Sequence, residues 1–234
     1  MSDIPARLGR VRDRIASAAR RARRDPSSIR LVAISKTFPA ADIRDAAAAG
    51  QRDFGENRVQ DALQKMDETA SLGLTWHLVG HLQSNKARKA ATAFDVIHSV
   101  DDALLLAKLD AGAAEAGHRL ALLVQVDIAG ETTKHGAHPD QLLPIFDAAR
   151  LCKAAQVTGL MLLPPAVLEP EKARPYFAAV CRLRDELTAR GVAAAMLAEL
   201  SMGMSHDFEV AVEEGATLVR VGSAIFGTRG QGGV

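Results

Sequence analysis

Lys36 directly follows the short apolar segment LVAIS at residues 31–35. Apolar surroundings disfavour the charged ammonium form, so they lower the pKa of a buried lysine. A neutral amine is the nucleophile that forms a Schiff base with a carbonyl compound. The alternative is a surface lysine whose aliphatic stem covers the rim of the fold. Position alone supports both interpretations.

Two segments near the other end of the chain, SMGMS at 201–205 and RVGS at 220–223, combine small residues with hydroxyl groups. Small residues allow backbone N–H groups to approach an anion closely. The candidate ligands of a phosphate group are therefore the hydroxyls of Ser201, Ser205 and Ser223 and the amide of Gly222. The alternative is a pair of tight turns, each joining a strand to a helix.

Arg220 lies two residues before Gly222, within a short apolar segment. A buried arginine requires an acceptor, which could be a phosphate, a ring nitrogen or a carboxylate in the core. The lysine and the two phosphate-binding turns together indicate a phosphorylated aldehyde held as an imine. Pyridoxal 5′-phosphate (PLP) has this profile.

The histidines give no comparable pattern. His77 and His81 are four residues apart, but they bracket the end of a predicted strand rather than sharing a helical face. No HExxH motif accompanies them and a metal site would need further ligands, so we expect no metal. The other histidines are scattered and are interpreted as ordinary polar residues, namely His98, His118, His135, His138 and His206.

Short apolar segments alternate with helical patterns along the chain. The expected strands are residues 31–35, 52–56, 76–80, 95–99, 120–128, 157–163, part of 195–203, and 217–222. The expected helices are residues 42–49, a helix capped by Asn57 and covering 59–66, and residues 84–92, 103–116, 140–149, 171–190 and 208–214.

This alternation requires a parallel sheet with helical crossovers, and about eight repeats close a (β/α)8 barrel. In that fold, reactive groups lie at the carboxyl ends of the strands, and a phosphate site commonly follows the last two. The alternative is an open doubly wound sheet, which usually has a glycine-rich turn after its first strand. The first predicted strand ends instead in SKTFP.

Residues 1–25 predict an additional N-terminal helix. Ile4, Leu8, Val11 and Ile15 recur at helical spacing, with arginines between them. A transit peptide has a similar arginine-rich pattern, but aspartates interrupt the basic face. We expect the helix to pack on the barrel within one domain, residues 1–234, because no linker divides the chain.

The composition excludes several classes of function. The 234 residues carry a net charge of +1, and only 4% are aromatic, which argues against a nucleic-acid-binding protein. No segment approaches the roughly 20 apolar residues of a membrane span. Cys152 and Cys181 are far apart and form no CxxC motif, which is typical of a reduced protein of the cytoplasm.

Segments along nearly the whole chain resemble the PLP homeostasis protein family, also known as the YggS/PROSC family. They are LVAISKTFP around Lys36, DFGENRVQDALQK (53–65), WHLVGHLQSNKARKA (76–90), GLM (159–161), LSMGMSHDFEVAVEEGATLVRVGSAIFG (200–227) and the closing Arg229. The SMGMS and VRVG segments are highly specific in combination with SKT and GEN. The resemblance implies a barrel similar to the N-terminal domain of alanine racemase.

The resemblance also implies that PLP forms an aldimine with Lys36 and that Asn57 lies beside the ring. Arg220 is expected to face the cofactor and to contact either its pyridine nitrogen or its phosphate. The phosphate would be held at the last two strand ends by Ser201, Ser205, Gly222 and Ser223. The sequence departs from the family at Asp127, where asparagine is usual, and at His135, where serine is common.

The resemblance leaves two functions to compare. An arginine at the pyridine nitrogen makes PLP a weaker electron sink than an acidic partner would. In the similar racemases, a tyrosine from a separate domain supplies the second base, whereas the only tyrosine here, Tyr176, falls on a predicted outer helix. We therefore expect a non-catalytic, monomeric carrier that buffers PLP or delivers it to apo PLP-dependent enzymes. The alternative is a PLP-dependent amino-acid racemase.

Overall fold

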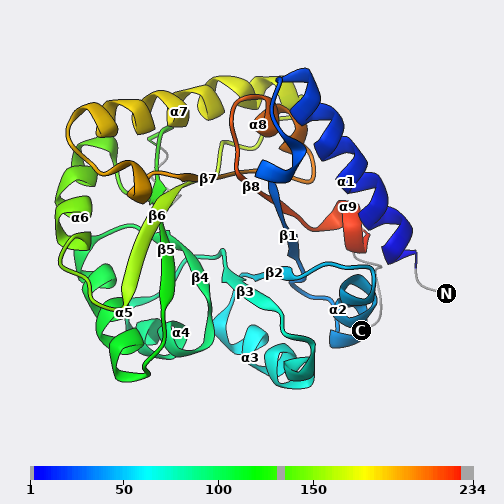
Figure 1. Cartoon of the computed structure of the whole chain (residues 1–234), viewed down its shortest axis with the longest axis horizontal. Helices are drawn as coiled ribbons and strands as arrows, with labels where there is room; N and C mark the ends of the chain where they lie inside the picture. Colours follow the sequence, from blue (N-terminus) through cyan, green and yellow to red (C-terminus); the bar gives the residue numbers. More distant parts are fainter. Residues whose placement is uncertain (1–2, 131–134, 228–234) are drawn as a thin grey trace.

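Short apolar segments lie side by side in the computed structural model, which describes residues 3–130 and 135–227. The strands are β1 (Arg30–Ile34), β2 (Asp53–Glu56), β3 (Thr75–Leu78), β4 (Val96–Val100), β5 (Leu120–Val126), β6 (Ala155–Leu162), β7 (Glu199–Met204) and β8 (Leu218–Val221). Each strand pairs in parallel with the next, and β1 pairs with β8, which closes the barrel shown in Figure 1. The predicted (β/α)8 barrel is confirmed.

Helices connect successive strands around the outside of the barrel (Figure 1). They are α2 (Ala40–Ala48), α3 (Val59–Glu68), α4 (Ala87–Ala93), α5 (Ala103–Glu115), α6 (Leu142–Ala149), α7 (Arg174–Ala189) and α8 (Phe208–Glu213). The short α9 (Ser223–Phe226), which the sequence pattern did not predict, follows β8. One predicted detail is wrong: Arg58 occupies the cap position of α3, so Asn57 does not cap this helix.

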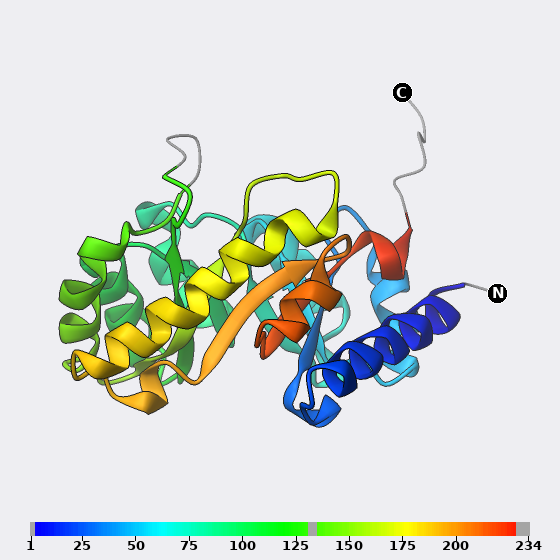
Figure 2. The ribbon, with the colours of Figure 1, turned by 90° about the horizontal axis from the view of Figure 1, so that it is seen from above.

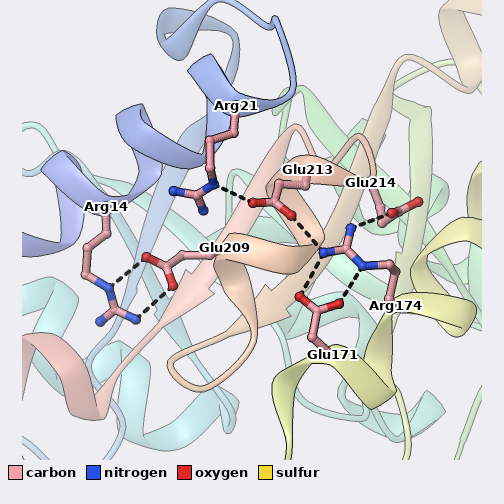
Figure 3. Close-up of polar contacts among 7 residues, drawn as sticks. All are labelled: Arg14, Arg21, Glu171, Arg174, Glu209, Glu213 and Glu214. Carbon is pink, nitrogen blue, oxygen red and sulfur yellow. Dashed lines mark hydrogen bonds and ion pairs between the residues drawn. The ribbon is translucent and has the colours of Figure 1, made fainter.

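The N-terminal helix α1 (Ile4–Arg21) packs along one side of the barrel, against α8, α9 and α2. Its apolar stripe is buried, and Figure 2 shows the helix running beside the barrel wall. Arg14 and Arg21 of this helix form ion pairs with Glu209 and Glu213 of α8 (Figure 3). Both apolar contact and charge therefore hold α1 in place.

The barrel interior is filled by alternate residues of the strands, because successive side chains of a strand point to opposite faces. The apolar part of this interior consists of Val32, Ile34, Val79, Val96, Leu123, Met161 and Leu218. The other face of each strand packs against the helices. In the described part of the chain, no helix is both long and apolar enough to cross a membrane.

Candidate functional site

A cavity of about 770 Å³ opens among the loops that follow the strands. Its lining includes six of the seven candidate residues, namely Lys36, Asn57, Ser205, Arg220, Gly222 and Ser223. They come from opposite ends of the sequence because β1, β2, β7 and β8 are neighbours in the closed barrel. Ser201 is not part of the lining.

Lys36 lies in the tight turn that follows β1. The Phe38 amide donates to the carbonyl oxygen of Ser35 at 3.0 Å, so Lys36 and Thr37 are the central residues of this turn. Thr37 has a φ of 69°, which is strained for a β-branched residue. The turn carries Lys36 out of the strand, and its side chain is exposed. Of the two interpretations of Lys36 given above, the one in which apolar surroundings withdraw the amine from water is therefore wrong.

A buried polar cluster supports this turn from outside the barrel. The Oε1 atom of Glu56 accepts hydrogen bonds from the Ser35 hydroxyl and from the Nζ atom of Lys65, both at 2.7 Å. Lys65, on α3, also donates to the carbonyl oxygen of Ser35 at 2.8 Å. The sequence reasoning missed this cluster. A glutamate inside the short segment DFGE was the available signal, because a buried carboxylate requires a partner.

The ends of β7 and β8 form a small cradle of backbone amides. The amides of Gly222 and Ala224 both donate to the Ser205 hydroxyl, at 3.1 and 3.4 Å. A Cβ atom on Gly222 would lie 3.2 Å from the carbonyl oxygen of Ile34, a contact tight enough that the neighbouring backbone would have to shift by a few tenths of an ångström. Amides that converge on one oxygen atom form a concave site that suits an anion.

Arg220 closes the floor of the cavity. Its Nη1 atom donates to the Ser201 hydroxyl at 2.5 Å, and its Nη2 atom donates to the carbonyl oxygen of Leu162 at 2.8 Å. Burial lowers the pKa of Arg220 to about 10, and the Asp207 carboxylate opposes this shift. The guanidinium therefore remains a cation at neutral pH.

Ser201 lies below Arg220, inside the barrel. Its hydroxyl also contacts the Nδ1 atom of His98 at 2.8 Å, and the Nε2 atom of His98 lies 2.9 Å from the Nδ1 atom of His77. Sequence reasoning treated His98 as ordinary and dismissed His77. The missed signal was one histidine in each of two short apolar strands that the barrel places side by side.

The wall opposite the cradle contains Asn57, Gly80 and two stacked histidines. The rings of His81 and His135 are 3.5 Å apart between centroids and nearly parallel. Burial and the neighbouring His135 lower the pKa of His81. Potential metal-ligand atoms of His81, Asp101 and His135 lie within 4.8 Å of one another. However, parallel rings direct their in-plane lone pairs side by side rather than toward one point.

Of two further positions noted in the sequence, the structure describes one. His135, where the sequence departs from its family, lies on the cavity wall. Arg229, the closing residue of the matched segments, lies outside the described residues.

An amine, a buried guanidinium and an amide cradle on one barrel rim define a barrel protein suited to a small anionic carbonyl compound. The sequence matches the family "Alanine racemase, N-terminal domain" over residues 7–230. It is 42% identical to the pyridoxal phosphate homeostasis proteins of Aquifex aeolicus and Pseudomonas aeruginosa. The matches cover 95% and 99% of this chain and 97% and 98% of those proteins.

A solved structure of PipY from Synechococcus elongatus PCC7942 with PLP bound is 43% identical and superimposes with a TM-score of 0.85. The match covers 96% of this chain and all of that chain (100%). The chain therefore belongs to the pyridoxal phosphate homeostasis protein family.

Proposed function

We propose that this protein binds PLP on Lys36 and holds it for buffering or delivery to other proteins. The observation that carries the proposal is that Lys36, Arg220 and the Gly222 amide line one cavity. PLP offers an aldehyde that an amine captures reversibly and a phosphate dianion. The PLP-bound structure of PipY, a similar protein, supports the same assignment.

The residues present fit PLP in distinct positions. Ser205, Gly222 and Ser223 would hold the phosphate, because the amides at the end of β8 already converge on an oxygen atom. Arg220 lies on β8, two residues before Gly222 and therefore about 7 Å deeper by the rise of a β-strand. It would therefore face the ring rather than the phosphate. Asn57 would lie beside the ring.

Ser201 does not enter the proposed phosphate site. Its hydroxyl is buried and already engaged with Arg220 and His98, and it lies outside the cavity lining. Its role toward the cofactor would be indirect, through Arg220.

The carrier function is favoured over the racemase function by the groups on the cavity wall. Arg220, rather than a carboxylate, would face the pyridine nitrogen, and this cation disfavours protonation of the ring. Tyr176, the only tyrosine in the sequence, lies on α7 and does not line the cavity. We propose that the recipients are apo PLP-dependent enzymes and that the carrier acts as a monomeric, single-domain protein of the cytoplasm. Two free cysteines are consistent with that reducing compartment.

Borohydride reduction tests the assignment of Lys36. Protein loaded with PLP and then reduced should carry one stable adduct, which peptide mass spectrometry should locate on Lys36. The Lys36→Ala variant should carry none, whereas the control Lys89→Ala, a surface lysine, should be labelled like the wild type. Labelling spread over several lysines, or persisting in Lys36→Ala, would show that Lys36 is misassigned.

A second experiment separates the carrier from the racemase. Loaded protein is mixed with an apo PLP-dependent enzyme, and the recovery of that enzyme's activity measures transfer. The same preparation is assayed for racemisation of amino acids. We expect transfer without appreciable racemisation. Robust racemisation that Lys36→Ala abolishes would reject the carrier function and favour the racemase.

A further inference from the structure

A line of polar side chains runs through the barrel from the cavity floor toward the opposite end. Starting from Arg220, the guanidinium contacts Ser201, and Ser201 contacts the Nδ1 atom of His98 at 2.8 Å. The Nε2 atom of His98 lies 2.9 Å from the Nδ1 atom of His77. Finally, the Nε2 atom of His77 lies 3.0 Å from the Oδ1 atom of Asp53, at the start of β2.

The middle of this line is sealed from water. His77, His98 and Ser201 are each 0% exposed, whereas the Asp53 side chain at the far end is 21% exposed. Buried polar groups must satisfy one another, because each unpaired group costs free energy. The hydrogen-bonding choice of any member therefore constrains its neighbours.

The two ends fix the direction of the hydrogen bonds. A guanidinium only donates, so Ser201 must accept from Arg220. A carboxylate only accepts, so Asp53 draws the hydrogen of His77 onto Nε2. The Nδ1 atom of His77 is then an acceptor and receives the Nε2 hydrogen of His98. The Nδ1 atom of His98 in turn accepts the hydroxyl hydrogen of Ser201, which leaves a lone pair of Ser201 for Arg220.

Hydrogen bonds donated in the opposite direction along this line would be less favourable at both of its ends. This direction would require either a charged His77 or a bare ring nitrogen facing the Asp53 carboxylate. It would also leave the Ser201 hydroxyl hydrogen with no acceptor among the residues that the structure describes. A neutral His98 is favoured independently, because burial and the nearby His77 and Arg220 hold the pKa of His98 well below its ordinary range.

We infer that Asp53, His77, His98 and Ser201 form a positioning relay that fixes the Arg220 guanidinium on the cavity floor. Asp53 sets the tautomers of both histidines, and the oriented Ser201 hydroxyl holds Nη1 of Arg220. The inference rests on the proposed function only where it concerns PLP. It makes retention of PLP depend on a carboxylate at the opposite end of the barrel, which has no place in the cavity lining.

Nitrogen NMR of histidine-labelled protein without PLP tests the relay itself. At pH 7.5, long-range nitrogen–proton spectra should show His77 and His98 as neutral rings that carry hydrogen on Nε2. The two signals are assigned by their loss in the His77→Gln and His98→Gln variants. A hydrogen on Nδ1 of His98, or a charged ring at either position, would overturn the inference.

The Asp53→Asn variant tests the influence of the far end. Asparagine fills the same space but can also donate to His77, so we expect a mixture of tautomers at His98. We expect PLP to be released about 5-fold faster, roughly the factor that one hydrogen bond is worth. The matched control is Asp95→Asn. Its carboxylate accepts from the Trp76 amide at 2.7 Å and takes no part in the relay, so it should change neither the His98 spectrum nor PLP release.

The outcomes separate the relay from the proposed function. Unchanged His98 signals in Asp53→Asn would overturn the relay, and so would altered signals with wild-type release of PLP. If the wild type bound no PLP on Lys36, the proposed function would fail. The spectra of the free protein would still decide whether Asp53 orients the histidines.

Discussion

The Nζ atom of Lys65 lies 2.7 Å from the Oε1 atom of Glu56, beneath the turn that carries Lys36. The side chains of this pair are 12% and 1% exposed, so water screens their attraction very little. The pair joins α3 to β2, and the Ser35 backbone ties it to the end of β1. The buried Lys65–Glu56 ion pair therefore contacts the backbone of the turn that carries Lys36, the lysine of the proposed PLP site.

Removal of one partner of this pair should be strongly destabilising. We expect Lys65→Met to lower the free energy of unfolding by about 3–5 kcal/mol, because Glu56 would remain as a buried charge without its cation. Urea titration provides the measurement. The control is Lys172→Met, which removes an exposed pair with Glu169 and should cost about 0–1 kcal/mol. Equal losses in the two variants would contradict the role given to the buried pair.

The contact between Gly80 and Asn57 gives a prediction about the cofactor site. A Cβ atom on Gly80 would lie 2.2 Å from the carbonyl oxygen of Asn57, so Gly80→Ala must displace the Asn57 backbone. We expect faster loss of PLP, measured by transfer to an apo-enzyme. Gly9→Ala is the control, since a Cβ there has no atom within 4 Å. If the Gly80→Ala variant lost PLP no faster than the wild type, the position of Asn57 would not affect PLP retention.

The buried His98 should make stability depend on pH. In the unfolded chain His98 binds a proton near pH 6.5, whereas in the native protein its pKa lies well below this value. Below pH 6.5 the unfolded state therefore binds more protons, and the native protein loses stability as the pH falls. The contribution is complete above that pH. The slope from this one group is at most about 1.4 kcal/mol per pH unit.

Urea titrations between pH 7.5 and 5.5 measure this slope. The His98→Gln variant should be less stable throughout but should show a flatter dependence on pH. His138→Gln, at an exposed loop position, should keep the wild-type slope. If His98→Gln retained the full slope, another group would be responsible.

Arg174, at the start of α7, pairs with three carboxylates: Glu213 and Glu214 at the end of α8, and Glu171 in the turn just before α7. It pairs with Glu171, Glu213 and Glu214 at 2.7 Å each, and Glu213 also binds Arg21 of α1 (Figure 3). Its side chain is 33% exposed, so screening reduces each pair. We expect Arg174→Met to cost roughly 2 kcal/mol in thermal or urea unfolding, as a network of several weak pairs.

Arg184→Met is the matched control for this network. Arg184 lies on the same helix and pairs only with its neighbour Asp185 among the described residues. We expect a loss of less than about 1 kcal/mol. A loss as large as that of Arg174→Met would assign the effect to the helix rather than to the bridge between α7, α8 and α1.

The sequence by itself determined the order of the elements and the position of the lysine that we propose binds PLP. Apolar segments too short for helices alternate with segments of helical periodicity. This pattern is local, so it can be recognised without knowing the tertiary contacts. Lys36 follows the first strand, and Gly222 and Ser223 follow the last. Closure of the barrel makes these two strands neighbours, so the three residues lie on one rim. Closure itself followed from the number of repeats.

The tertiary structure decided which partners each side chain meets. Whether Ser201 binds an anion or Arg220 depends on its depth in the barrel, which strand tilt and stagger set and which no local pattern records. The pairing of His77 with His98 likewise requires β3 and β4 to be in register. The exposure of Lys36 depends on a single strained turn. A local pattern fixes where a strand ends, but only the packed barrel fixes what lies across from it.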